Sequence, residues 1–280
     1  MNAIELTNVS KRYGNFRLKD ITVQIPEGCI LGIIGENGAG KSTLLEMILG
    51  LTAKDSGKVT VLGCDDLSKH HEIREKIGFV IEKAGFPSVL SAKDMNSILK
   101  DTYQNWNEAY YFEILNRLEG DTDRKFKTLS QGNRMKVLIA AALAHQPQLL
   151  IMDEATNFLD PSARAEVTNI LYEYTRDEHR TVVLSSHITS DLEKTADYIL
   201  FLHKGEILGY APKDEILDQY RYVTVEPEII DSLEDGMVIA RRETGYGSEA
   251  VIKSEALTED MHVRSASLEE IFTALVKGVI

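Results

Sequence analysis

The stretch Gly35-Glu36-Asn37-Gly38-Ala39-Gly40-Lys41-Ser42 decides the fold. It fits the pattern G-x-x-x-x-G-K-[ST], follows the apolar run Cys29–Ile34 and leads into apolar residues at helical spacing over Ser42–Leu49. Glycines let such a loop bend until its backbone N–H groups surround a phosphate, and the helix N-terminus adds partial positive charge. The loop therefore predicts a nucleoside triphosphate site, in which Lys41 reaches the β- and γ-phosphates and the Ser42 hydroxyl ligates Mg²⁺. A shorter glycine fingerprint for dinucleotides lies in the same stretch, but the Lys-Ser pair favours the triphosphate.

Two acidic residues follow a second apolar run. Leu149–Met152 ends in Asp153 and Glu154, and α/β folds place their ligands at the carboxyl ends of parallel strands. Asp153 can hold Mg²⁺, directly or through water, and Glu154 can polarise the attacking water as a general base. A glutamate at this position predicts that hydrolysis is intact.

Around these motifs the chain alternates strand and helix segments, which predicts an α/β fold. Residues 92–125 read as mostly helical, and Lys204-Gly205 predicts a hairpin turn. After about Tyr220 the sequence pattern changes. We expect a small appendage there that ends in a helix over Ser267–Val276. The further strands that we expect are Ile4–Val9, Leu18–Ile25, Val59–Leu62, Ile77–Ile81, Thr181–Leu184, Ile199–Leu202, Glu206–Leu208, Tyr222–Val225, Met237–Ala240 and Ala250–Ile252.

Composition limits the classes of function. The 280 residues hold 31 Lys and Arg against 44 Asp and Glu, a formal net charge of −13, which argues against general nucleic-acid binding. The longest uncharged apolar stretch, Val137–Ala144, is far shorter than the roughly 20 residues that span a bilayer, and no signal peptide opens the chain. We therefore expect neither an integral membrane protein nor a secreted one. Cys29 and Cys64 lack metal-ligand spacing and are expected to be reduced thiols.

A third motif connects these observations. Leu129-Ser130-Gln131-Gly132-Asn133 precedes a long apolar helix, which alone is only a helix start. Together with the phosphate loop, the acidic strand and His187, it resembles the signature of the ATP-binding cassette (ABC) ATPases. The order and the spacings agree: 89 residues from Lys41 to Ser130, 23 from Ser130 to Asp153 and 34 from Asp153 to His187. The resemblance covers about residues 1–215.

The resemblance implies an α/β fold with a P-loop NTPase (RecA-like) core, an antiparallel β subdomain and a helical subdomain at residues 83–128. Together with the small C-terminal α+β appendage expected from the sequence after Tyr220, this predicts an ATPase domain over residues 1–218 and an accessory domain over 219–280. ATP and Mg²⁺ are the implied ligands. The implied partners are a second cassette, identical or a sister chain, and an integral membrane permease at the cytoplasmic face of a bacterial membrane. No nucleic-acid partner is expected.

The family's functional residues can be carried over one by one. Tyr13 matches the aromatic residue that stacks on adenine, although a half-buried strand tyrosine is the alternative. Ser130 and Gly132 match the groups that touch the γ-phosphate held by the other subunit. Asn157-Phe158-Leu159-Asp160 matches the loop that bridges the two subunits, with Asp160 as the anchoring acid. His187 matches the switch histidine, which contacts the γ-phosphate and acts in catalysis with Glu154 and Lys41. The residues that match the phosphate loop are Gly35, Asn37, Gly38, Ala39, Gly40, Lys41, Ser42 and Thr43.

Three positions depart from the family pattern. Glu82 stands where most members have glutamine, at a position that senses the metal, and resembles the subgroup paired with small exporter-type permeases, such as antimicrobial-peptide exporters. Asn133 replaces a longer amide and Ala155 replaces a proline; neither change removes a catalytic group. Gly85-Phe86-Pro87 is expected to dock a coupling helix of the permease. Nearby aromatic residues suit either a partner surface or the subdomain's own core: Tyr103, Trp106, Tyr110, Tyr111 and Phe112.

Three functions compete. A transport ATPase that powers export of a substrate, possibly a peptide, through a separate permease fits a single cassette best. A soluble ABC ATPase of DNA repair or translation is the alternative, but the 89-residue interval leaves no room for a long coiled coil and only one cassette is found. A regulatory module that holds ATP without hydrolysing it is opposed by Glu154 and His187.

Overall fold

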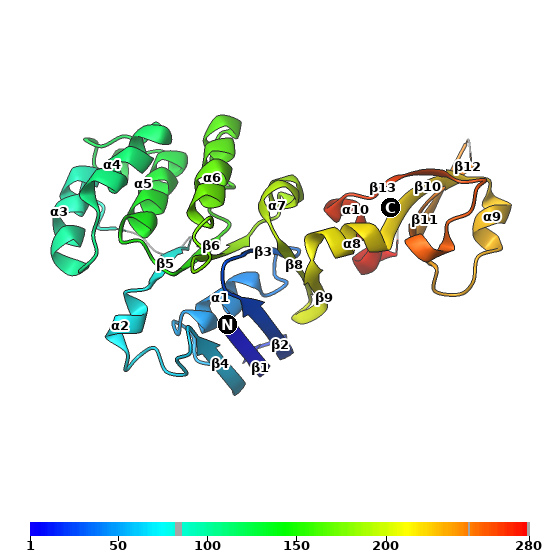
Figure 1. The fold of residues 1–280 in the computed structure, drawn as a ribbon, viewed down its shortest axis with the longest axis horizontal. Coiled ribbons are helices and arrows are strands. Elements are labelled where there is room, and N and C mark those ends of the chain that lie inside the picture. The colour runs from blue at the N-terminus through cyan, green and yellow to red at the C-terminus, as the bar shows by residue number, and fades with distance from the viewer. Residues whose placement is uncertain (82–85, 246, 279–280) are drawn as a thin grey trace.

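The computed structural model describes residues 1–81, 86–245 and 247–278. At its centre lies a six-stranded sheet in the order β5-β6-β7-β3-β8-β9, in which only the β8–β9 pair is antiparallel (Figure 1). This arrangement confirms the α/β prediction and the P-loop core. The strands are β3 (Ile30–Ile34), β5 (Ile77–Val80), β6 (Leu149–Asp153), β7 (Thr181–Ser185), β8 (Tyr198–His203) and β9 (Glu206–Pro212).

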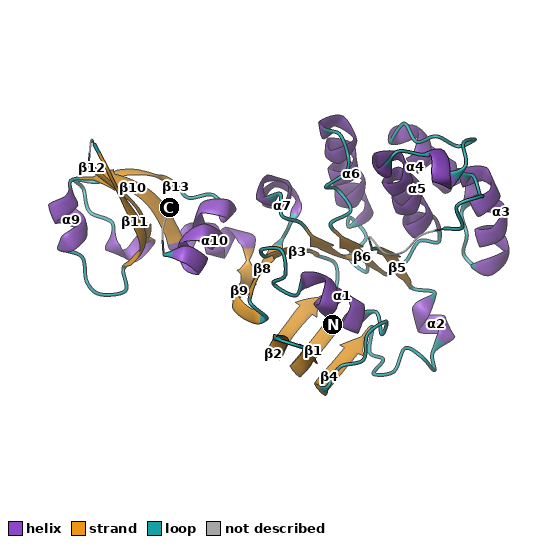
Figure 2. Ribbon diagram, turned by 180° about the vertical axis from the view of Figure 1, so that it is seen from behind, coloured by secondary structure: helices purple, strands orange, loops and turns teal. Residues whose placement is uncertain are grey.

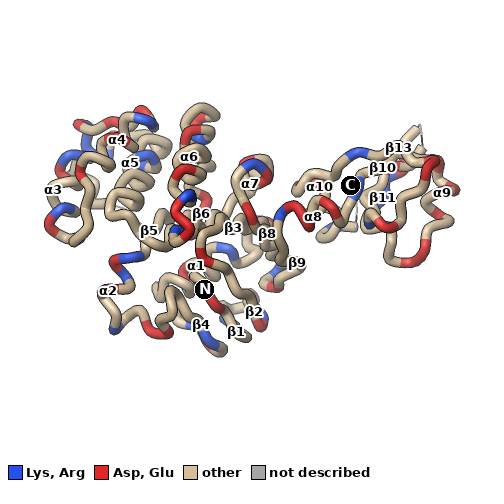
Figure 3. Tube along the Cα trace, viewed as in Figure 1, with Lys and Arg blue, Asp and Glu red and all other residues tan. Residues whose placement is uncertain are grey.

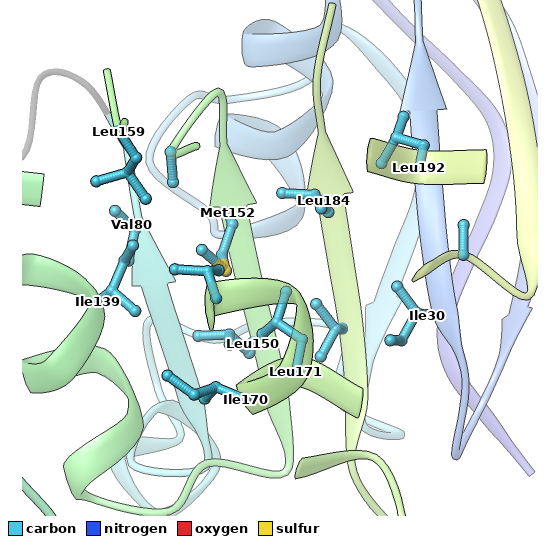
Figure 4. Packing of buried hydrophobic residues seen from close by; sticks show 14 of the residues in the cluster. Ile30, Val80, Ile139, Leu150, Met152, Leu159, Ile170, Leu171, Leu184 and Leu192 are labelled. Atoms are coloured by element: carbon cyan, nitrogen blue, oxygen red, sulfur yellow. The ribbon is translucent and has the colours of Figure 1, made fainter. Parts of the chain in front are cut away.

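Both faces of this sheet are buried, which explains why its strands are apolar runs. Ile30 and Ile34 of β3 pack into one buried cluster, whereas Leu31 and Ile33 pack into the other. Figure 4 shows the first cluster around the central strands, and Figure 2 shows helices on both sides of the sheet. The first face is covered by α5 (Gln131–Ala144), α6 (Pro161–Tyr174), α7 (Thr189–Thr195) and α10 (Leu268–Lys277), and the second by α1 (Lys41–Ile48).

An antiparallel sheet in the order β2-β1-β4 packs over α1, as expected for a β subdomain. Its strands alternate buried and exposed residues because the other face is open to solvent. The elements are β1 (Asn2–Tyr13), β2 (Phe16–Pro26) and β4 (Ser56–Val61), followed by the short helix α2 (His71–Arg74).

The helical segment forms one end of the molecule (Figure 1). It contains α3 (Ala92–Thr102), α4 (Glu108–Arg117) and a 3₁₀ turn (Phe126–Thr128), and it joins the first buried cluster through α5. Tyr111 is fully buried there, and Trp106, Tyr110 and Phe112 are partly buried against the same cluster. Most of the aromatic residues that could have formed a partner surface therefore pack the core of this segment.

The β8–β9 hairpin turn is formed by Lys204 and Gly205, as predicted. Both have positive φ, 46° and 82°, and a Cβ on Gly205 would lie 1.9 Å from the carbonyl oxygen of Arg17. Glycine is therefore required at this turn by its backbone conformation and by the close approach of β2.

The C-terminal part forms a second antiparallel sheet, in the order β11-β12-β10-β13, at the opposite end of the molecule (Figure 1). Three of its strands lie where the sequence predicts them. The elements are α8 (Lys213–Gln219), β10 (Tyr220–Val225), α9 (Pro227–Asp231), β11 (Val238–Thr244), β12 (Gly247–Lys253), a 3₁₀ turn (Ser254–Ala256) and β13 (His262–Ser265).

The final helix returns to the central sheet. Ser267 and Glu270 form a capping box at the start of α10, which agrees with the predicted cap. The ring of Phe272 packs against Phe201 of β8, with centroids 5.6 Å apart. The C-terminal residues thus share the buried cluster of the ATPase core, and the boundary between residues 218 and 219 stays a prediction.

The surface carries mixed charge. Lys and Arg residues are interspersed with Asp and Glu over the helical end and the C-terminal sheet (Figure 3). Within the described ranges, no helix combines the length and apolar character needed to cross a bilayer.

Candidate nucleotide-binding site

The phosphate loop connects β3 to α1, and its lysine is held inside it. Gly40 precedes α1 with φ of 109°, and a Cβ there would lie 2.8 Å from the ring of Phe16. The Lys41 side chain is only 4% exposed and its Nζ donates to the carbonyl oxygens of Gly35, at 2.8 Å, and Glu36, at 3.3 Å. Nζ also lies 3.3 Å from Oε1 of Glu154. The ammonium is therefore surrounded by oxygen atoms within the chain itself.

A cavity of about 370 Å³ adjoins this loop, and half of the predicted site residues line it. The two motifs meet here because β3 and β6 end at the same edge of the central sheet. Gly35 and the buried Ala39 lie behind the lining and shape the loop. The lining residues are Phe16, Asn37, Gly38, Gly40, Lys41, Ser42, Thr43, Asp153 and Glu154.

Tyr13, which is predicted to stack on adenine, does not line this cavity. Tyr13 is 46% exposed, its hydroxyl lies 3.5 Å from Oγ1 of Thr52, and Lys11 lies over its ring. The aromatic residue that does line the cavity is Phe16, at the start of β2. Sequence reasoning passed over Phe16, although its place in the hairpin beside Tyr13 was a usable signal.

The acids at the end of β6 are oriented by a serine of the neighbouring strand. In the parallel register, Asp153 pairs with Ser185 of β7. The Ser185 hydroxyl donates to Oδ1 of Asp153 at 2.5 Å and accepts the backbone N–H of Glu154 at 3.0 Å. Glu154 adopts a positive φ of 51°, a conformation that costs about 1 kcal/mol for a non-glycine residue and needs such support. Ser185 was also missed, because the register between two distant strands is not visible in the sequence.

The side chains of His187 and Glu154 are bridged by an asparagine. Nδ2 of Asn157 lies 3.0 Å from Oε2 of Glu154 and 3.0 Å from Nδ1 of His187. The direct separation between His187 Nδ1 and Glu154 Oε2 is 3.8 Å, too long for a hydrogen bond. The three side chains therefore form one cluster at the ends of β6 and β7.

The signature residues lie apart from this cavity. Ser130 is the exposed N-cap of α5, where its Oγ accepts the backbone N–H of Asn133 at 3.2 Å. Gly132 packs so tightly that a Cβ would lie 2.8 Å from the carbonyl oxygen of Phe158. Neither signature residue lines the chain's own cavity, which fits their implied role toward a second subunit.

The loop after the acids is anchored at its end by Asp160. Its Oδ1 accepts the backbone N–H of Ala163 at 2.9 Å, which caps α6, and this bond lowers the pKa of the carboxyl group. Lys136 of α5 lies 3.7 Å from the other carboxylate oxygen. Within this chain, Asp160 thus anchors the loop beside the signature helix.

The remaining departures from the family pattern have mild local effects. Oδ1 of Asn133 accepts the backbone N–H of Asp121 at 3.3 Å, and Ala155 is fully buried. Glu82 and Gly85 lie outside the described residues.

Comparisons with known proteins agree with this geometry. A family model described as "ABC transporter" matches residues 18–157. The bacitracin transport ATP-binding protein BcrA of Bacillus licheniformis is 32% identical over 222 residues, which are 78% of this chain and 72% of that protein. The lantibiotic transport ATP-binding protein SrtF of Streptococcus pyogenes is 35% identical over 208 residues, which are 73% of this chain and 89% of that protein.

A solved structure extends the likeness to the fold. The dimeric, post-hydrolysis state of the ATP-binding cassette MJ0796 bound to ADP and Pi aligns with a TM-score of 0.67 and 27% identity, covering 75% of this chain and 98% of that one. The relatives named here are transport proteins, and they do not support the alternative of DNA repair or translation.

Proposed function

Since the chain belongs to the ABC transporter family, we propose that it is the ATP-hydrolysing subunit of an exporter that works with a second cassette and a separate membrane permease. The observation that carries the proposal is the cavity where Lys41, Ser42 and Glu154 meet at the ends of β3 and β6. The names of the relatives above, which refer to bacitracin and lantibiotics, support a peptide antibiotic as the exported substrate.

The residues of the cavity suit a triphosphate and its metal. The Ser42 hydroxyl and the Asp153 carboxylate are hard oxygen donors that line one cavity, the donor type that Mg²⁺ prefers, and we assign them to hold it, with Glu82 as a further proposed ligand. When bound, Mg²⁺ neutralises charge on the triphosphate. Lys41 holds the β- and γ-phosphates, while the glycines of the loop present backbone N–H groups.

Hydrolysis then depends on groups that already lie together. Glu154 polarises the attacking water, and for this its carboxylate must leave the ammonium of Lys41. His187 contacts the γ-phosphate from the adjacent strand end. Ser130 and Gly132 act on the nucleotide of a second cassette, since they lie outside the chain's own cavity. Two chains therefore complete two sites.

We place the permease contact beside the helical segment. An apolar cavity of about 220 Å³ lies between β5, α3 and α5, and its lining includes Phe79, Phe86 and Tyr103. Phe79 is 39% exposed although it is aromatic, which supports the docking of an apolar segment of the permease. Docking here would hold the chain at the inner face of the membrane. Residues 219–280 are the proposed accessory domain.

The test of ATP hydrolysis uses the purified full-length chain and phosphate release. We expect Glu154→Gln to abolish turnover and to accumulate as an ATP-bound dimer in size-exclusion chromatography. Glu228→Gln, the same change on the exposed surface of α9, is the matched control and should hydrolyse ATP like the wild type. Undiminished turnover in Glu154→Gln would overturn the assignment of the base.

The test of the partner is co-purification. A membrane protein encoded beside this chain should be isolated with the wild type and lost with Phe79→Asp, while the basal ATPase activity of the variant stays intact. Equal recovery with both chains would place the permease contact elsewhere.

A further inference from the structure

Asn157 begins the 157–160 loop, in which only Asp160 has been given a role, and it is the only described residue whose side chain bridges Glu154 and His187. It lies on the loop between β6 and α6. This loop is held by a turn, in which the backbone N–H of Asn157 donates to the carbonyl oxygen of Glu154 at 3.2 Å. Nη2 of Arg164 also donates to the carbonyl oxygen of Leu159 at 3.2 Å. The amide is thus carried on a tethered backbone and not on a free loop.

The orientation of the amide follows from its neighbours. With Nδ2 toward Glu154, an N–H donor faces a carboxylate oxygen at 3.0 Å. The reversed amide would set the carbonyl oxygen Oδ1 against that carboxylate, two acceptors in contact, and would bury an NH₂ group where Oδ1 now lies without a partner among the described residues. The first orientation is therefore the stable one.

This orientation determines the proton on the histidine. The second hydrogen of Nδ2 points to Nδ1 of His187, also at 3.0 Å. A donor can be met only by an unprotonated nitrogen, so Nδ1 must act as acceptor and the proton of the neutral ring must be on Nε2. The Nε2–H group is then the donor that the ring can offer to a phosphate oxygen.

We propose that Asn157 is a positioning residue that sets the tautomer of His187, so that Nε2–H donates a hydrogen bond to the γ-phosphate. The same amide keeps Glu154 apart from the ring, which prevents the carboxylate from drawing the proton to Nδ1. The inference rests on the proposed ATPase function for its catalytic consequence, but the tautomer itself is a property of the nucleotide-free chain.

The first experiment measures the tautomer directly. Long-range ¹H–¹⁵N correlation spectra of the full-length, nucleotide-free chain report which ring nitrogen carries the proton, and His187→Gln assigns the signal. We expect the Nε2–H form in the wild type and a shift to protonated Nδ1 in Asn157→Asp, because a carboxylate accepts where the amide donated. An Nδ1–H tautomer in the wild type would overturn the proposal, whether or not the variant folds.

The second experiment measures the catalytic consequence. Asn157→Asp should lower kcat about 10²-fold, the order of effect seen when one donor of an oxyanion hole is removed, with little change in KM. Asn157→Ala leaves either tautomer of His187 accessible, so its kcat should fall less than that of Asn157→Asp. Asn169→Asp, the same change beside Glu166 on the exposed face of α6, is the matched control and should keep wild-type kcat.

The two possible routes of the effect are separated in a His187→Gln background. There, Asn157→Asp and Asn157→Ala should have equal kcat values, since no ring is left to orient. If kcat of Asn157→Asp were still lower than that of Asn157→Ala in this background, the residue would act through Glu154, and the proposal would be overturned. A wild-type chain with the expected tautomer but no ATP hydrolysis would instead contradict the proposed function.

Discussion

Neutralising Glu154 should tighten nucleotide binding, besides stopping hydrolysis. Its carboxylate occupies the position beside Lys41 Nζ, 3.3 Å away, and competes with the phosphates for that ammonium. Glu154→Gln removes the competing charge but keeps the size of the side chain. We therefore expect nucleotide to bind more tightly to the variant than to the wild type.

The magnitude follows from the geometry. Two unit charges at 3.3 Å attract by about 5 kcal/mol at an effective dielectric constant of about 20, which is the upper limit. Because the Glu154 side chain is 30% exposed, water offsets much of this, and the net value of such pairs falls to about 1–2 kcal/mol. At 1.4 kcal/mol per factor of ten, the expected gain is roughly tenfold in Kd.

The assay is titration of the full-length chain with fluorescently labelled ADP, with and without Mg²⁺. ADP is chosen because it reports on Lys41 without hydrolysis. The control is Glu36→Gln, which removes one negative charge near the same loop but whose carboxylate pairs with His203 and Lys277 instead of Lys41. Equal gains in the two variants would show general electrostatic relief and refute the competition; weaker binding by Glu154→Gln would refute it as well.

Three further changes test the start of α5 and the C-terminal helix α10. Gly132→Ala adds a Cβ 2.8 Å from the carbonyl oxygen of Phe158 and should lower ATP hydrolysis by about 10²-fold with an unchanged circular dichroism spectrum; wild-type turnover would contradict this. Phe272→Ala removes a buried ring packed against β8 and should lower the unfolding free energy by about 3 kcal/mol and Tm by roughly 8 °C in calorimetry, whereas an unchanged Tm would mean that α10 adds nothing. The hydrogen bond from Arg264 lowers the pKa of Glu270, so its stabilisation is present above the unfolded-state pKa of about 4.3 and is lost as the pH falls through the folded value. Glu270→Gln should accordingly lower Tm at pH 7 and lose this effect as the pH falls from about 4.3 through the folded-state pKa, and a pH-independent difference would argue against the ion pair.

The sequence predicts the central sheet well, because buried parallel strands must be apolar runs and because their charged residues follow directly at the strand ends. Lys41 and Asp153 could be placed on such grounds. The short strand β13 was not predicted, since all four of its residues are exposed and carry no apolar pattern. It is a strand only because β10 offers it an edge.

The supporting residues of the site could not be found in the same way. Ser185 supports the site because the register of β6 and β7 pairs it with Asp153. Phe16 reaches the site because β2 brings its ring beside Gly40 of the phosphate loop. Asn157 matters because a tight turn brings its amide between two side chains that are 33 residues apart in the sequence. Each role depends on a contact between distant segments, which no local pattern encodes.

The net charge of −13 affects how the phosphate loop can attract a nucleotide. An acidic protein repels an anionic nucleotide at long range, so attraction must come from groups within a few ångströms, where the N–H groups of the loop and Lys41 dominate. Without nucleotide these groups would face Asp153 and Glu154 directly, and the structure shows both acids already occupied, one by the hydroxyl of Ser185 and the other by Lys41 and Asn157. Binding of a triphosphate is therefore an exchange of partners rather than the filling of a bare positive site. We expect this exchange to free the Glu154 carboxylate from Lys41 only when phosphate has taken its place, so that the proposed base becomes available only when its substrate is bound.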